Sequence, residues 1–185
     1  MILNRRSLVS ALPALALCAS PVFAQSNDTQ NTLVLETKNG RVTILLRPDL
    51  APKHVAQIKS LVQRGFYDGI VFHRVIPGFM AQTGDPTGTG GGGSDLPNLA
   101  AEFNAAPFKR GTLGMARSSS PNSANSQFFI CYDDASFLNG QYTVFGEVVS
   151  GMEVVDKIKM GTKEGNGAVT NPDKIVRMRM AGDAK

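Results

Sequence analysis

Tryptophan is absent from the 185-residue sequence, and histidine and cysteine each occur only twice. Neither His54 nor His73 has cysteines or carboxylates around it at the spacing of a metal site, so the sequence predicts no bound metal ion. Cys18 lies in a segment that we expect to be removed, which leaves Cys131 without a partner for an internal disulfide. Because Cys131 lies in an apolar run, we interpret it as a small buried hydrophobe.

Charge of either sign is also scarce. Charged residues make up 18% of the chain, and the formal net charge is +4. Removal of residues 1–24 takes away Arg5 and Arg6 but no acidic residue, which leaves a net charge of +2. So small a net positive charge is compatible with any fold or enzyme class, but it argues against binding to nucleic acid or to an anionic membrane.

The N-terminus carries an apolar stretch, LVSALPALALCAS, that is too short to span a bilayer comfortably. It follows two arginines and precedes VFA, whose small residues suit a cleavage site. Residues 1–24 are therefore predicted to be a secretory signal peptide cleaved after Ala24. The mature protein is expected to be periplasmic or otherwise exported, without stable membrane insertion. A retained membrane anchor, twin-arginine export and lipid attachment at Cys18 stay open as alternatives.

Strand and helix patterns follow a polar spacer at residues 25–31. Alternation on both sides of Asn39-Gly40 predicts a hairpin over residues 32–46. Pro52 and Gly65 bound a predicted helix, whose His54 is expected to face solvent. A second helix is predicted over 152–160, and further strands over 70–76, 79–85, 111–117, 127–132, 143–149 and 174–182.

These elements predict a mainly β protein. The strands do not alternate regularly with the helices, which argues against a parallel α/β sheet. About eight strands without exposed edges favour a closed eight-stranded antiparallel β-barrel capped by two α-helices. The length favours a single domain, which we place at residues 32–182.

Two motifs that could indicate other chemistry lack the context that such chemistry needs. Gly88, Gly90 and Gly93 match G-x-G-x-x-G, but prolines flank this loop and no helix begins there, which disfavours a dinucleotide site. The serines of ARSSSPNSANSQ lack a histidine and an acid in reach, which disfavours a serine hydrolase. The sequence therefore predicts no cofactor.

Arg74 is unusual because it lies in an apolar run, VFHRVIPGFMAQTGD, with no carboxylate close by in the segment. Strand alternation carries Ile76 to the same face, and the turn at Pro77-Gly78 brings Gln82 near it on a paired strand. One cation, one amide and several apolar groups suit the binding of an apolar group that accepts hydrogen bonds. A salt-bridged or snorkelling arginine is the alternative interpretation.

Three segments together resemble the cyclophilin-type peptidyl-prolyl cis/trans isomerases. FHRVIPGFMAQTGD is similar to the first signature of that family, GMAR with PNSANSQFFI to the second, and FLNGQYTVFGEV to the third. The resemblance extends over about Thr32 to Gly182, nearly the whole mature chain.

The resemblance implies an eight-stranded antiparallel barrel with two helices and an active site on its outer face. It places Arg74 at the catalytic arginine and implies that the backbone, not the side chain, of Arg117 holds the peptide. The other positions that it assigns to substrate binding are Phe79, Met80, Gln82, Ala116, Gln127, Phe129, Phe137, Leu138 and Tyr142.

Two positions depart from the best-known eukaryotic pattern of the family. Phe137 replaces a tryptophan whose indole donates a bond to cyclosporin, and Tyr142 replaces a histidine, as in bacterial members. We therefore expect weak cyclosporin binding at most. The predicted function is isomerisation of X–Pro bonds in unfolded or exported polypeptides by a monomer. The alternative is a proline-peptide-binding module or holdase chaperone without relevant turnover.

Overall fold

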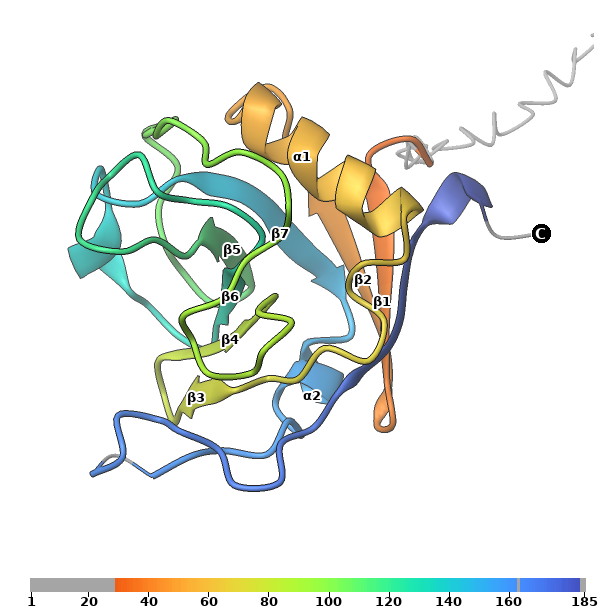
Figure 1. Ribbon diagram of the computed structural model, residues 1–185, viewed down its shortest axis with the longest axis vertical. Helices are drawn as coiled ribbons and strands as arrows, with labels where there is room; N and C mark the ends of the chain where they lie inside the picture. Colours follow the sequence, from red (N-terminus) through yellow and green to blue (C-terminus); the bar gives the residue numbers. More distant parts are fainter. Residues whose placement is uncertain (1–28, 163, 184–185) are drawn as a thin grey trace, which may run out of the picture.

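A computed structural model describes residues 29–162 and 164–183 (Figure 1). The predicted signal peptide, its cleavage site and most of the polar spacer lie outside the described residues. The described chain contains no helix with the length and apolar character needed to cross a bilayer. Its elements are β1 (Thr32–Thr37), β2 (Gly40–Leu46), α1 (Pro52–Gln63), β3 (Arg74–Ile76), β4 (Met80–Thr83), β5 (Thr112–Met115), β6 (Phe128–Cys131), η1 (Ser136–Leu138), β7 (Val144–Ser150), α2 (Met152–Val155), β8 (Ile175–Met180) and η2 (Ala181–Asp183).

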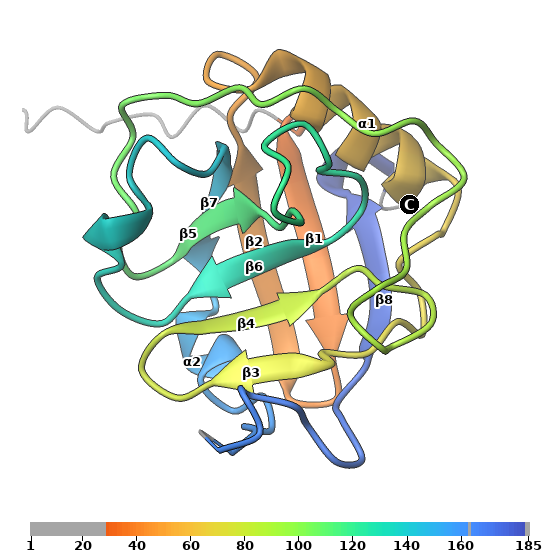
Figure 2. The same cartoon turned by 60° about the vertical axis from the view of Figure 1, so that its left-hand side comes forward.

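The eight strands form one antiparallel sheet in the order β3-β4-β6-β5-β7-β2-β1-β8. The sheet curls so that α1 lies across one end and α2 lies near the other (Figure 2). The hairpin predicted at Asn39-Gly40 is confirmed by the pairing of Thr37 with Gly40. Gly65 follows α1 with a φ of +67°, which confirms its predicted place just beyond the helix.

The sheet is open, so the predicted closed barrel is wrong. Its edge strands β3 and β8 share no ladder, and the chain beside them makes only an isolated bridge between Val71 and Lys174 and single bonds such as Phe72 N to Asp173 O at 2.9 Å. Farther along β8, Met178 N donates to the Asp68 carboxylate at 2.9 Å instead of to a strand. The strand predicted over 70–76 forms only at its last three residues, which is too short for a closing ladder.

The second helix is also shorter than predicted. Strict helix covers only Met152–Val155, because the chain turns at Asp156 and Lys157 N bonds to Val154 O. Val154, Val155 and Ile158 are still buried in the core. One helical turn and the bend after it therefore bury the same apolar residues that predicted a longer helix.

Alternating side chains divide the interior into two apolar clusters. Along β6, Phe128 and Ile130 face the large core inside the curled sheet, together with Leu35, Ile44 and Phe145. Phe129 and Cys131 point to the other face and join a smaller cluster. Cys131 is fully buried, as predicted, and burial followed by the charge of Asp134 raises the pKa of its thiol to about 12. The smaller cluster supports the surface described below.

His54 is buried, so its predicted exposure is wrong. Its ring Nδ1 donates to the Glu102 carboxylate at 2.6 Å, and the same carboxylate accepts the backbone N–H groups of Lys53 and His54 at 3.1 Å each. Glu102 therefore satisfies donors at the start of α1 that have no partner within a helix. These hydrogen bonds connect the segment before β5 to α1.

Replacing Glu102 by Gln should reduce the free energy of unfolding by about 1–3 kcal/mol at pH 7, because buried donors lose a charged acceptor. Burial raises the pKa of Glu102, but hydrogen bonds from the His54 ring and from the two backbone N–H groups lower it by more. The net shift of the pKa is therefore downward. The carboxylate therefore contributes its full stabilisation above the unfolded-state pKa of about 4.3, and this contribution is lost as the pH falls below that value and through the lower pKa of the folded state.

Urea unfolding of the wild type and of Glu102→Gln at pH 7, 5 and 3 measures the effect. The difference between the two proteins should shrink as the pH falls. Glu153→Gln, at an exposed position of α2, is the control and should change stability by less than about 0.5 kcal/mol at every pH. A difference that stays constant down to pH 3 would contradict the assignment.

Candidate active site

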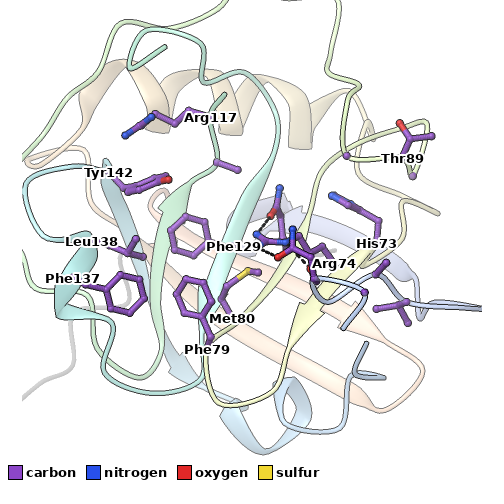
Figure 3. Close-up of a pocket in the computed structure, with 18 residues that line it drawn as sticks. His73, Arg74, Phe79, Met80, Thr89, Arg117, Phe129, Phe137, Leu138 and Tyr142 are labelled. Atoms are coloured by element: carbon purple, nitrogen blue, oxygen red, sulfur yellow. Dashed lines mark hydrogen bonds between the residues drawn. The ribbon is translucent and has the colours of Figure 1, made fainter. Parts of the chain in front are cut away.

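A hollow of about 620 Å³ lies on the outer face of β3, β4 and β6 (Figure 3). The structure brings ten of the eleven predicted site residues together around it: Arg74, Phe79, Met80, Gln82, Ala116, Arg117, Phe129, Phe137, Leu138 and Tyr142. Gln127, the eleventh, lines an adjoining hollow and is bonded to Gln82. His73 also lines the first hollow, mostly buried, and burial lowers the pKa of its imidazole.

One half of the hollow is apolar. Phe129, only 5% exposed, forms the floor with Met80, while Phe137, 63% exposed, stands at the rim with its ring 5.2 Å from that of Phe79. The rings of Phe129 and Tyr142 pack edge to face, with their centres 5.9 Å apart. Gly114 of β5 lies beneath Phe129, and a Cβ there would overlap the ring, so only glycine lets this floor lie flat.

Arg74 lies at the polar half, opposite the apolar walls (Figure 3). Its Nη1 donates to Gln82 Oε1 at 3.1 Å, its Nε to the Asn166 carbonyl at 3.0 Å, and its Nη2 to Asn166 Oδ1 at 3.0 Å. All of these acceptors are neutral, and the described residues supply no ion pair to Arg74. Burial lowers the pKa of Arg74 and the nearby Tyr142 opposes that shift, but an arginine stays protonated at neutral pH.

A relay of amides fixes the side of Arg74 that faces β4. Because arginine only donates, Gln82 must present its oxygen to Arg74 and its amide nitrogen to Gln127 Oε1, 2.9 Å away. Gln127 Nε2 then donates to the carbonyls of Gly90 and Gly92 at 3.0 and 2.8 Å. The orientation of each amide is thus determined by the guanidinium and by the glycine-rich loop.

Asp85 holds this glycine-rich loop in shape. Its fully buried carboxylate accepts the N–H of Thr87 at 2.8 Å, of Gly90 at 2.6 Å and of Gly92 at 3.2 Å, and the Thr87 hydroxyl at 2.8 Å. Burial raises the pKa of Asp85, but these hydrogen bonds outweigh it and lower the pKa to about 2. The loop that resembled a dinucleotide motif is therefore organised around an internal carboxylate.

Asn166 is a site residue that the sequence did not indicate. It lies 92 positions after Arg74, in a loop between α2 and β8, and its φ of +50° is in the left-handed region. The Asn-Gly pair at 166–167 is a signal for positive φ, but nothing in the sequence places this loop over Arg74. In the described part of the chain, no group of three or more His, Cys, Asp or Glu side chains could hold a metal ion.

The profile of the family "Cyclophilin type peptidyl-prolyl cis-trans isomerase/CLD" matches residues 32–180. The chain belongs to this family. It is 57% identical to the "Probable peptidyl-prolyl cis-trans isomerase" of Brucella suis biovar 1 (strain 1330), over 97% of this chain and 98% of the relative. It is 39% identical to the "Peptidyl-prolyl cis-trans isomerase A" of Dickeya dadantii (strain 3937), over 97% of each protein.

Solved structures agree with the family assignment. Cyclophilin AquaCyp293 from Hirschia baltica is 30% identical with a TM-score of 0.76, over 85% of this chain and 76% of that one. A Cryptosporidium parvum cyclophilin solved with the dipeptide Ala-Pro is 30% identical with a TM-score of 0.74, over 80% of this chain and 98% of that one. The protein is therefore a cyclophilin-type isomerase with an open, curled antiparallel sheet.

Replacing Asn166 by Gly should lower kcat/KM for isomerisation by roughly three- to tenfold, or about 0.7–1.4 kcal/mol. Glycine keeps the backbone carbonyl and accepts the positive φ, so only the Oδ1 acceptor of Arg74 is lost. Asn171→Gly is a matched control, because Asn171 has a φ of +51° and no contact with Arg74 among the described hydrogen bonds. Exchange NMR on a proline peptide gives the rates, and thermal unfolding shows that both variants fold. Equal activity of the two variants would show that Asn166 does not contribute to the candidate site.

Proposed function

We propose that this cyclophilin accelerates isomerisation of X–Pro bonds in unfolded or exported polypeptides without a covalent intermediate. The observation that carries the proposal is a guanidinium fixed at the edge of an apolar pocket. Arg74 has five N–H groups, and its bonds to Gln82 and Asn166 use three of them within the described residues. Two donors are left to meet a substrate in the hollow. The structure of the Cryptosporidium parvum relative was determined in the presence of the dipeptide Ala-Pro, which supports binding of proline-containing peptides.

The chemistry of the peptide bond explains why such a donor accelerates the reaction. Resonance gives the C–N bond partial double-bond character and a barrier of about 18–20 kcal/mol, so X–Pro bonds isomerise over roughly tens to hundreds of seconds. Twisting removes the resonance and leaves a lone pair on the prolyl nitrogen. An N–H of Arg74 donates to that lone pair more strongly in the twisted state than in the planar state, which lowers the barrier.

The arginine does not supply the whole effect. Reaching milliseconds requires an acceleration of about 10⁴–10⁵, or roughly 5.5–7 kcal/mol. One charge-assisted hydrogen bond contributes about 1.5–3 kcal/mol. The remainder comes from the apolar walls, Phe79, Met80, Phe129 and Leu138, which hold the proline ring away from water, and from peptide positioning by Gln82 and the backbone at Ala116 and Arg117.

We further propose that the protein acts as a monomer and binds cyclosporin weakly, since Phe137 has no N–H to donate. A binding module or holdase would use the same apolar walls without turnover. The fixed orientation of Arg74 favours the enzyme, because binding of a proline ring by itself does not require a held guanidinium.

Replacing Arg74 by Ala should lower kcat/KM by at least roughly ten- to a hundredfold while peptide affinity falls much less, because the lost bond of about 1.5–3 kcal/mol acts mainly on the twisted state. Arg74→Lys keeps the charge but loses the planar fork, so it should restore activity only in part. Line-shape or exchange NMR on one proline peptide gives affinity and interconversion rate together.

Arg64→Gln serves as control, since Arg64 is bound to Asp95 away from the hollow and its loss should leave both quantities unchanged. Equal losses of affinity and turnover in Arg74→Ala would make the arginine a binding contact only. A wild type that binds the peptide without speeding its interconversion would support the binding module.

We also propose export to the periplasm or beyond, on the basis of the basic start, the short apolar stretch and the small residues before Gln25. Protein isolated from the native cell envelope should therefore begin at Gln25. Intact-mass spectrometry tests this directly. A species that retains Met1, or one that begins at a lipid-modified Cys18, would contradict cleavage after Ala24.

A further inference from the structure

The guanidinium of Arg117 lies over Tyr142, a wall of the proposed proline pocket. Its guanidinium carbon is 4.4 Å from the centre of the Tyr142 ring. Nε and Nη2 donate to the Gln141 carbonyl at 3.3 and 3.1 Å, and Nη1 donates to the Ser118 carbonyl at 2.9 Å. The side chain is therefore held in one place at the rim, although the family resemblance assigns only its backbone to the peptide.

Arg117 lies where two hollows meet. The hollow that contains Arg74 and a second one of about 470 Å³ share Gln82, Gly90, Ala116 and Arg117. A polypeptide that places a proline in the first hollow and continues into the second must pass Arg117. The charge at this junction therefore acts on the residues beside the proline.

The charge of Arg117 is not compensated. Five arginines of the described chain form ion pairs with carboxylates: Arg41, Arg47, Arg64, Arg110 and Arg179. Arg74 and Arg117 instead donate to neutral oxygens. Among the described residues, no carboxylate lines either hollow, and the exposed Glu164, beside Gly165 of the first hollow, is not part of either lining. The linings of the two hollows thus combine two cations with no acid, and the apolar walls of the first hollow strengthen the field beside them.

We propose that Arg117 is a specificity-determining residue that favours prolyl segments with an acidic side chain next to the proline and disfavours those with a basic one. The inference rests on the proposed function and adds the class of substrate. Arg74 is directed at the imide, whereas Arg117 is at the rim, where a flanking side chain passes. Because the rim is open to water, we expect a preference of roughly three- to tenfold for an acidic over a basic residue, typical of a partly screened charge pair.

Peptides that share one Ala-Pro bond, with Glu, Gln or Lys placed in turn two positions before, at the position before and at the position after the proline, test this inference. Exchange NMR on each peptide gives affinity and kcat/KM. At about 20 mM salt, Glu should exceed Lys by roughly three- to tenfold at one or more positions, and about 0.5 M salt should reduce the ratio below about twofold, because ions screen exposed charges. A Glu-to-Lys ratio near one at every position in the wild type would overturn the inference.

Variants assign the effect to Arg117. Arg117→Gln should abolish the Glu-to-Lys preference, Arg117→Lys should retain it, and Arg117→Glu should reverse it. Arg64→Gln removes the same formal charge from an ion-paired arginine and should keep the wild-type ratio. Circular dichroism checks that each variant is folded, and the ratio within each variant is informative whatever its overall activity. An unchanged ratio in Arg117→Gln and Arg117→Glu would overturn the proposal.

The same peptides distinguish failure of the proposed isomerase mechanism from failure of the proposed substrate preference. If the neutral peptide binds but is not interconverted faster, the enzyme mechanism is wrong, and the Glu-to-Lys ratio of affinities still tests Arg117. If the neutral peptide is accelerated and the ratio is flat, the mechanism stands and the substrate preference is wrong.

Discussion

The site depends on keeping a guanidinium charged, fixed and without a carboxylate partner beside apolar walls. A carboxylate bound to Arg74 would neutralise its charge and occupy the donors that the substrate needs. The structure instead holds Arg74 with neutral oxygens, from Gln82 on one side and from Asn166 on the other. Neutral acceptors orient the planar fork and leave its positive charge unpaired, which the proposed mechanism uses on the twisted imide.

Two loops, far apart in the sequence, supply this neutral frame. Asp85 lies beneath the glycine-rich loop and sets its carbonyls toward Gln127, and the loop at Asn166 adopts a left-handed conformation above Arg74. Asp85 is the only carboxylate in this chain of contacts among the described residues, and it is bonded to N–H and hydroxyl groups and not to the arginine. The Asp85 carboxylate thus holds the glycine-rich loop without contacting Arg74, and within the described part of the chain only neutral oxygens contact the guanidinium.

The sequence predicted those features that depend on short-range periodicity. Alternation and the Pro77-Gly78 turn placed Gln82 opposite Arg74, and the structure pairs these two residues directly. Closure of the barrel would require pairing between β3 and β8, which are distant in the chain, and these two strands form no ladder. The burial of His54 escaped prediction for the same reason, because its partner Glu102 is 48 residues away. The role of Asn166 likewise depends on a tertiary contact.

Arg74 and Arg117 lie in different surroundings, which suit them to different roles. Arg74 is partly buried, is held by Gln82 of β4 and by Asn166, and lines the hollow together with the apolar walls. Arg117 lies over Tyr142 at the junction of two hollows, where its field reaches whatever passes along the rim. In the proposed mechanism, a held donor beside apolar walls discriminates between the planar and the twisted state of one bond, whereas a charge at the open rim discriminates between substrates. On the two proposals made above, rate and selectivity depend on different arginines, and a change at the rim need not alter the chemistry at the imide.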